Sequence, residues 1–131
     1  MIEYSESKSI TTDQFIDLLK RSTLAERRPV NDRARIDGML KYGNVLVTAW
    51  HNDLLVGISR ALSDFSFCCY LSDLAVDEKY QHKGIGKELI RLTHEKSGKN
   101  TTLILLAAPK AAEYYPKIGM ERFTDCFLIR S

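Results

Sequence analysis

The spacing of hydrophobic residues separates a helical N-terminal part of the chain from a strand-rich part that follows it. Apolar residues three and four apart after Thr11 predict a helix, and Gln14 stands at the capping-box position relative to Thr11. A second helix is predicted from Asn31 to Gly43, where a glycine can end it. Weak alternation over residues 2–7 predicts a short opening strand, so the chain begins as strand, helix, helix.

After Gly43 the period of the apolar residues changes to that of strands. Three strands come first, followed by a helix, a buried strand, a short helix and one or two closing strands. These elements are predicted over residues 45–50, 54–62, 67–76, 84–98, 101–107, 110–115 and 122–129. Antiparallel strands followed by β-α-β crossovers indicate an α+β fold, in three layers of the α/β type, with the order β-αα-βββ-α-β-α-β(β).

Composition narrows the classes of function. The 131 residues fit one domain, 1–131, and the 44% hydrophobic and 27% charged residues are those of an ordinary globular protein. A net charge of +2 argues against a nucleic-acid partner. There is no apolar run of the ~20 residues that a membrane span requires, and no signal-peptide pattern, so we expect no membrane association and a cytoplasmic location. The three cysteines and three histidines lack the spacing of a metal site, so no metal is predicted.

The segment of residues 71–87 combines a buried strand, a polar turn and two glycines that open a helix. Gly84 and Gly86 let the backbone approach a ligand closely, and the free N–H groups of a helix N-terminus favour a phosphate. A Walker loop is excluded because Glu88 stands where Ser or Thr is required. A dinucleotide fingerprint is excluded because Leu89 replaces its third glycine. A tight strand-to-helix turn without a ligand is the alternative that the two glycines alone leave open.

Two motifs resemble those of one enzyme family. Gln81-x-x-Gly84-x-Gly86, preceded by the run 73–76, resembles the acetyl-coenzyme A loop of the GNAT N-acetyltransferase superfamily. Residues 111–120 are similar to the Ala-x-x-Phe-Tyr-x-Lys-x-Gly-Phe segment of the same family. The motifs lie in the family's order, and with the N-terminal elements the resemblance covers essentially the whole chain. It implies a central mixed, mostly antiparallel sheet flanked by helices.

The resemblance implies an enzyme that transfers the acetyl group of acetyl-coenzyme A directly to a primary amine of a small molecule or peptide. The coenzyme would be held by the backbone of the strand predicted over residues 67–76, by the glycine loop and by packing of one tyrosine. The cofactor-binding residues implied in this way are Leu74, Ala75, Val76, Gln81, His82, Lys83, Gly84, Ile85, Gly86, Lys87 and Tyr114. A non-catalytic coenzyme A-binding or sensory module of the same fold is the alternative. The resemblance is compatible with both a monomer and a homodimer.

The resemblance also points to catalytic residues. Tyr115 matches the family's tyrosine that protonates the departing thiolate, with packing beside the coenzyme as its alternative role. Asp73 is the acid nearest in sequence to the cofactor segment and is the candidate general base, with a structural carboxylate as the alternative. Many family members have Asn seven residues before the tyrosine, where this chain has Ala108. Pro116 predicts a break or kink in the helix at the tyrosine.

Specificity for the amine acceptor is expected from the helical segment near the N-terminus and from the turns beside the sheet. The candidate residues are Arg27, Arg28, Trp50, Arg60 and Asp64. A surface role is the alternative for each arginine, and a core position is the alternative for the tryptophan.

Overall fold

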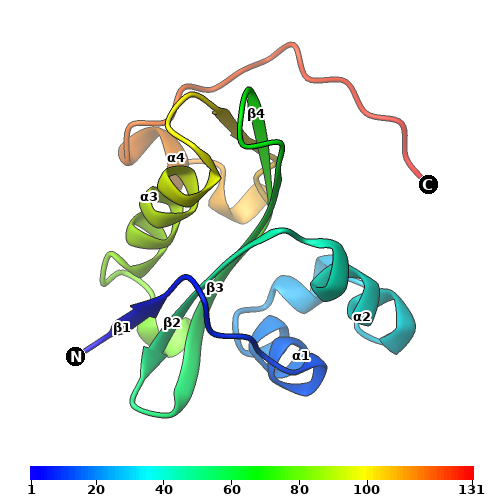
Figure 1. Cartoon of the computed structure of the whole chain (residues 1–131), viewed down its shortest axis with the longest axis vertical. Helices are drawn as coiled ribbons and strands as arrows, with labels where there is room; N and C mark the ends of the chain where they lie inside the picture. Colours follow the sequence, from blue (N-terminus) through cyan, green and yellow to red (C-terminus); the bar gives the residue numbers. More distant parts are fainter.

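The computed structural model describes residues 1–131 and contains one five-stranded sheet with helices on both faces (Figure 1). The strands lie in chain order and neighbouring strands are antiparallel, except that β4 and β5 are parallel. The strands are β1 (Glu3–Ser5), β2 (Val45–His51), β3 (Leu54–Ser63), β4 (Cys68–Val76) and β5 (Thr102–Leu105). The helices are α1 (Thr12–Arg21), α2 (Arg33–Tyr42), α3 (Ile85–Ser97) and α4 (Tyr114–Lys117), with 3-10 turns η1 (Leu24–Arg27), η2 (Glu78–Tyr80) and η3 (Pro109–Ala111). The predicted mixed, mostly antiparallel α+β fold is thereby confirmed.

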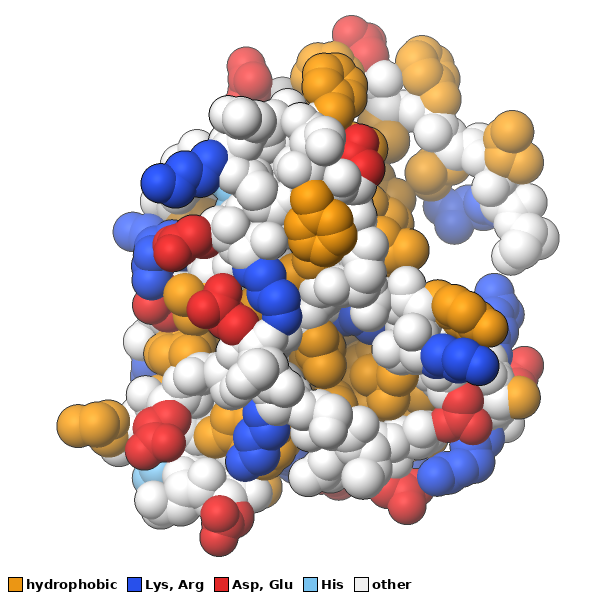
Figure 2. All heavy atoms as spheres, viewed as in Figure 1, with side chains coloured by type: hydrophobic (Ala, Val, Ile, Leu, Met, Phe, Trp, Pro, Cys, Tyr) orange, Lys and Arg blue, Asp and Glu red, His pale blue; other side chains and the backbone are white.

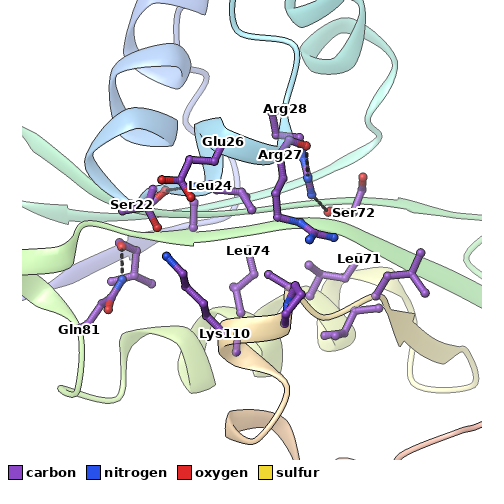
Figure 3. Close-up of a pocket in the computed structure, with 18 of the residues that line it drawn as sticks. Ser22, Leu24, Glu26, Arg27, Arg28, Leu71, Ser72, Leu74, Gln81 and Lys110 are labelled. Carbon is purple, nitrogen blue, oxygen red and sulfur yellow. Dashed lines mark hydrogen bonds between the residues drawn. The ribbon is translucent and has the colours of Figure 1, made fainter.

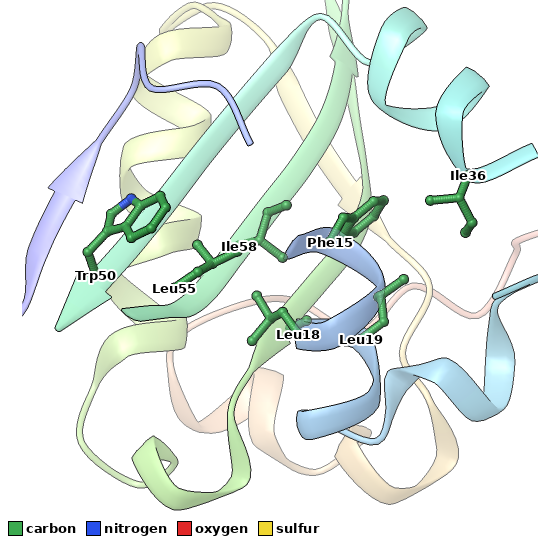
Figure 4. Packing of buried hydrophobic residues seen from close by; sticks show 8 residues of the cluster. Phe15, Leu18, Leu19, Ile36, Trp50, Leu55 and Ile58 are labelled. Atoms are coloured by element: carbon green, nitrogen blue, oxygen red, sulfur yellow. The ribbon is translucent and has the colours of Figure 1, made fainter. Parts of the chain in front are cut away.

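One face of the sheet is covered by α1 and α2. The predicted capping box at the start of α1 is present, because the Thr11 side chain accepts from the Gln14 backbone and the Gln14 side chain accepts from the Thr11 backbone. The apolar side chains of α1 point at the sheet and form one core cluster with residues of α2, β2, β3 and β4 (Figure 4). The buried members of this cluster are Phe15, Leu18, Leu19, Ile36, Trp50, Leu55, Ile58 and Ala75.

The opposite face is covered by α3, which packs through Ile85 and Leu89 against residues of β2 and β3. Gly57 of β3 lies beneath this helix, and a Cβ built on it would stand 3.0 Å from a methyl group of Leu89. The glycine therefore allows α3 to approach the sheet closely. Two helical layers with a sheet between them produce the three-layer arrangement, and no helix is long and apolar enough to cross a membrane.

A β-bulge divides β4 into two parts. Leu71 and Asp73 both have partners in β3, so Ser72 between them is an extra residue. The extra residue reverses the alternation of side chains, since Leu71 packs with the cluster that contacts α3 whereas Ala75 packs beneath α1. Pairing of β4 with β5 ends at Leu71 opposite Leu105. Beyond the bulge, β4 has no strand partner on its β5 side, and the two strands leave an opening in the sheet.

The predicted closing strands over residues 122–129 are not formed. This segment has no regular secondary structure and extends away from the body of the molecule, with apolar side chains along it (Figure 2). Phe127 is 89% exposed and Phe123 is 71% exposed. The alternation of apolar and polar residues favours a strand, but a strand also requires a neighbour for its backbone hydrogen bonds, and none lies beside this segment.

Candidate active site

The opening between β4 and β5 leads into a cavity of about 620 Å³. On one side it is bordered by η1 and the residues that flank it, and on the other by η3 and α4, with β4 between them (Figure 3). Its lining combines the open part of β4 with polar and charged side chains of η1. The residues that line this large cavity and were expected at the site from the sequence are Leu74, Ala75, Val76, Gln81 and Tyr115.

A second cavity of about 350 Å³ surrounds the N-terminus of α3. The residues of the glycine loop line it together with both tyrosines of the second motif. The expected residues in this lining are Leu74, Val76, Gln81, His82, Gly84, Ile85, Gly86, Lys87, Tyr114 and Tyr115. The two cavities share Leu74, Val76, Gln81, Lys110, Ala111 and Tyr115, so the structure brings the two sequence motifs together at one continuous site.

The glycine loop turns sharply before α3. His82 and Gly84 both adopt left-handed backbone conformations, with φ of 64° and 81°, and only glycine does so without steric cost. The first hydrogen bond of α3 runs from the Glu88 N–H to the Gly84 carbonyl. The N–H groups of residues 85–87 therefore have no acceptor within the helix, and the positive end of the helix dipole lies at the second cavity. Such a site suits a phosphate group.

Tyr114 contacts this helix terminus directly. A Cβ built on Gly86 would lie 2.9 Å from the Tyr114 hydroxyl, so the absence of a side chain at residue 86 makes room for the ring. Burial raises the pKa of Tyr114, against a hydrogen bond from the backbone of Lys87 that lowers it. Tyr114 thus packs against the loop, and its hydroxyl oxygen accepts a hydrogen bond from the helix N-terminus.

The turn between β4 and the glycine loop is held by two side chains. Gln81 donates from Nε2 to the Val76 carbonyl at 3.0 Å, which ties the loop to the end of β4. Asp77 is buried and accepts from Arg21 at 2.6 Å as well as from the Lys79 backbone. Sequence reasoning missed Asp77 and Arg21, because the two residues are far apart in the chain and neither belongs to a motif.

Tyr115 lies where the two cavities meet. Burial is the largest cause that raises the pKa of its hydroxyl, and the neighbouring Tyr114 raises it further. The hydroxyl therefore stays protonated at neutral pH and is available as a proton donor. The predicted break at Pro116 is wrong, because α4 begins at Tyr114 and contains the proline in its first turn. Backbone N–H groups in the first turn of a helix have no acceptor within the helix, so proline, which lacks an N–H, is tolerated there.

Asp73 is placed unlike a general base. Its side chain is 0% exposed, and its two oxygens accept from the Nε atoms of Arg28 and Arg60, each at 2.5 Å. Both carboxylate oxygens are therefore occupied by guanidinium donors, and neither is directed toward an incoming amine. The structure therefore supports the structural role that was the alternative for Asp73, and the bulge at Ser72 is what turns it toward these arginines.

The other specificity candidates are scattered. Arg27 and Arg28 line the large cavity, whereas Trp50 lies in the core beneath α1. Asp64 lies in the β3–β4 turn, where three backbone N–H groups donate to its carboxylate and lower its pKa to about 2. Of the candidates, only the two arginines of the η1 region line the site, and Arg60 reaches it indirectly through its hydrogen bond to the Ser72 hydroxyl.

Sequence comparison connects the chain with one domain family. A family model described as "Acetyltransferase (GNAT) domain" matches residues 20–127. A protein named histone acetyltransferase TAP1 from Glycine max is 37% identical over 71 residues, which cover 51% of this chain and 30% of that protein. The chain thus spans less than a third of that relative's length.

Solved structures with the same fold are numerous. A probable acetyltransferase from methicillin-resistant Staphylococcus aureus superposes with a TM-score of 0.79 at 20% identity, over 100% of both chains. An aminoglycoside 6'-N-acetyltransferase complexed with coenzyme A superposes with a TM-score of 0.71 at 20% identity, over 89% of this chain and 83% of the other. At these identities the likeness shows a common fold.

Proposed function

The chain belongs to the GNAT acetyltransferase family, and on this premise we propose that it transfers the acetyl group of acetyl-coenzyme A directly to a primary amine. The observation that carries the proposal is the joining of two cavities at Tyr115, one at a phosphate-binding helix terminus and the other at the open edge of β4. A donor and an acceptor can therefore reach one reacting centre from two sides.

The residues of the second cavity fit the diphosphate of coenzyme A. The backbone N–H groups of Ile85 and Gly86 lack helical acceptors, that of Lys87 donates to the Tyr114 hydroxyl, and the Cβ position of Gly84 points into open space. Lys87 lines this cavity and adds positive charge for the phosphates, and Lys83 belongs to the same loop without lining the cavity. We propose that His82 and Ile85 contribute through their backbone, as the expected loop residues.

The open edge of β4 fits the pantetheine arm. Residues 74–76 have no strand partner on the β5 side, so their backbone groups on that side can pair with the amides of the arm as an added strand would. Leu74 and Val76 line both cavities, which connects the phosphate end to the acyl end. A backbone N–H near Leu74 is our candidate for stabilising the developing oxyanion.

We propose Tyr115 as the proton donor. As the amine nitrogen bonds to the acetyl carbon, the carbon–sulfur bond breaks and the thiolate takes the Tyr115 proton. A thiol has a pKa near 8.5, so a phenol at or above 10 gives up this proton against a gradient of about 2 kcal/mol, which is modest beside an enzymatic barrier. Water in the large cavity would take the amine's own proton, because Asp73 is neutralised by two guanidinium groups.

The first test is a thermal-shift titration with acetyl-coenzyme A, with ATP and NAD as controls. A ligand at 100 times its Kd adds about 2.7 kcal/mol of stability, which raises the Tm by roughly 10 °C for a domain of this size. A selective shift, followed by thiol release in the presence of amines, supports the proposal. No shift for a folded protein contradicts it.

A non-catalytic coenzyme A-binding module is the second candidate. Two observations favour it, namely Ala108 in the cavity lining where family members often have Asn, and the lack of a free Asp73. A shift with acetyl-coenzyme A but no thiol release with any amine would support this candidate.

A further inference from the structure

The large cavity carries opposite charges at two ends of its η1 side. The Glu26 carboxylate lies on the Ser22 side, whereas the Arg27 guanidinium extends over β4 on the side of Leu71 (Figure 3). Neither side chain has an ion-pair partner within 4.0 Å in the structure. Both charges are therefore available to a molecule that enters the cavity.

Beneath Arg27, the group formed by Arg28, Asp73 and Arg60 carries a net positive charge. One carboxylate serves two guanidinium groups, and Asp73 is the only acid within ion-pair distance of either. The Arg60 side chain is 8% exposed and the Arg28 side chain 20%, so water compensates little of the remaining charge. An uncompensated charge in such a place is unfavourable, and an anion bound nearby would stabilise it.

Arg28 is the member of this group that reaches the cavity. Its Nε donates to Asp73, while Nη1 donates to the Arg27 carbonyl at 2.8 Å and Nη2 to the Ser72 carbonyl at 2.7 Å. A guanidinium has five N–H donors, so two of them have no protein acceptor here. These contacts fix the plane of the guanidinium beside Arg27 at the wall of the cavity.

We propose that the amine acceptor carries an anionic group, a carboxylate or a phosphate, and that Arg27 and Arg28 bind this group. The proposal rests on the acetyl-transfer function proposed above. Two guanidinium groups of neighbouring residues suit an oxyanion with more than one oxygen, because each can donate to a different oxygen. Glu26, at the opposite end, is placed to attract the ammonium group of the same molecule.

The experiment compares acceptors that differ only in the anionic group. β-Alanine is paired with β-alaninamide, and O-phosphoethanolamine with ethanolamine, in a thiol-release assay with saturating acetyl-coenzyme A. For the wild-type chain we expect kcat/KM at least tenfold higher for the anionic member of one pair, and the pair that responds separates carboxylate from phosphate. Arg27→Gln should raise KM for that acceptor at least tenfold and leave KM for its neutral partner unchanged within twofold.

Arg35→Gln is the matched control, because Arg35 is an exposed arginine of α2 outside the cavity. It should leave both members of each pair unchanged. Equal loss of anionic and neutral acceptors in Arg27→Gln, or a preference of the wild type for the neutral members, would overturn the proposal.

Calorimetry with the same four compounds and coenzyme A-saturated protein separates this proposal from the acetyl-transfer function. Binding of an anionic member that Arg27→Gln weakens tenfold, without thiol release, supports the anion site and contradicts acetyl transfer. Thiol release or binding without any preference for the anionic members contradicts the anion site alone.

Discussion

Replacement of Asp73 by Asn tests whether this carboxylate is structural or catalytic. The substitution removes one negative charge from a site where the side chain is 0% exposed and leaves the guanidinium groups of Arg28 and Arg60 without a counter-ion. Breaking a buried ion pair by removing one partner costs about 3–5 kcal/mol. Since a domain has only about 5–15 kcal/mol of stability in total, Asp73→Asn should lose a large part of it.

Urea unfolding, monitored by far-UV circular dichroism, measures the effect. With a slope of about 1–3 kcal/mol per M, we expect the midpoint of unfolding to fall by about 1 M or more. Asp13→Asn is the control, because the Asp13–Arg33 pair is exposed on both sides and should be worth about 0–1 kcal/mol. The structural assignment is refuted if Asp73→Asn matches the control in stability while kcat falls a hundredfold and KM is unchanged, since that pattern marks a general base.

Three further predictions follow from the site and the turn beside it. Tyr115→Phe should lower kcat more than tenfold with little change in the Kd of acetyl-coenzyme A, and an unchanged kcat would remove Tyr115 as the proton donor. Gly84→Ala and Gly119→Ala both place a Cβ in open space at a positive φ, so each should cost about 1–2 kcal/mol of stability, yet only Gly84→Ala should also weaken binding of acetyl-coenzyme A in a titration. The lowered pKa of Asp64, about 2 against an ordinary value of 3.8, contributes stability above pH 3.8 that is lost as the pH falls to about 2. The difference in Tm between the wild type and Asp64→Ala should accordingly narrow over that range, and a difference that stays constant would contradict the lowered pKa.

The parts of the site that sequence reasoning predicted are those encoded locally. Gln81, Gly84 and Gly86 stand within six residues, and the positive φ of Gly84 and the crowding at Gly86 explain why glycines occupy these positions. The α1 capping box is equally local and is present as predicted. A short motif fixes its own backbone geometry, so its spacing is sufficient to predict it.

The parts that could not be predicted depend on contacts between distant residues. Arg28 and Arg60 reach Asp73 across 45 and 13 residues, and the bulge at Ser72 decides which face of the sheet Asp73 occupies. The run of residues 67–76 is mostly apolar rather than alternating, so the sequence gives no sign of the reversal. The strand prediction for residues 122–129 is wrong for a related reason. Their pattern of apolar and polar residues is typical of a strand, but it does not specify which strand would pair with it.

The parallel pairing of β4 with β5 has a consequence for the order of folding. Antiparallel strands β2, β3 and β4 are joined by short turns, so their contacts close small loops and should form early. β5 can join only after the intervening α3 has crossed over the sheet, which closes a much longer loop. The opening beside β4 thus takes its final shape at a late step, and β5 should exchange its amide hydrogens faster than β3. A ligand that binds in this opening therefore binds only the fully folded chain. By contacting the strand that forms last, it should also slow unfolding.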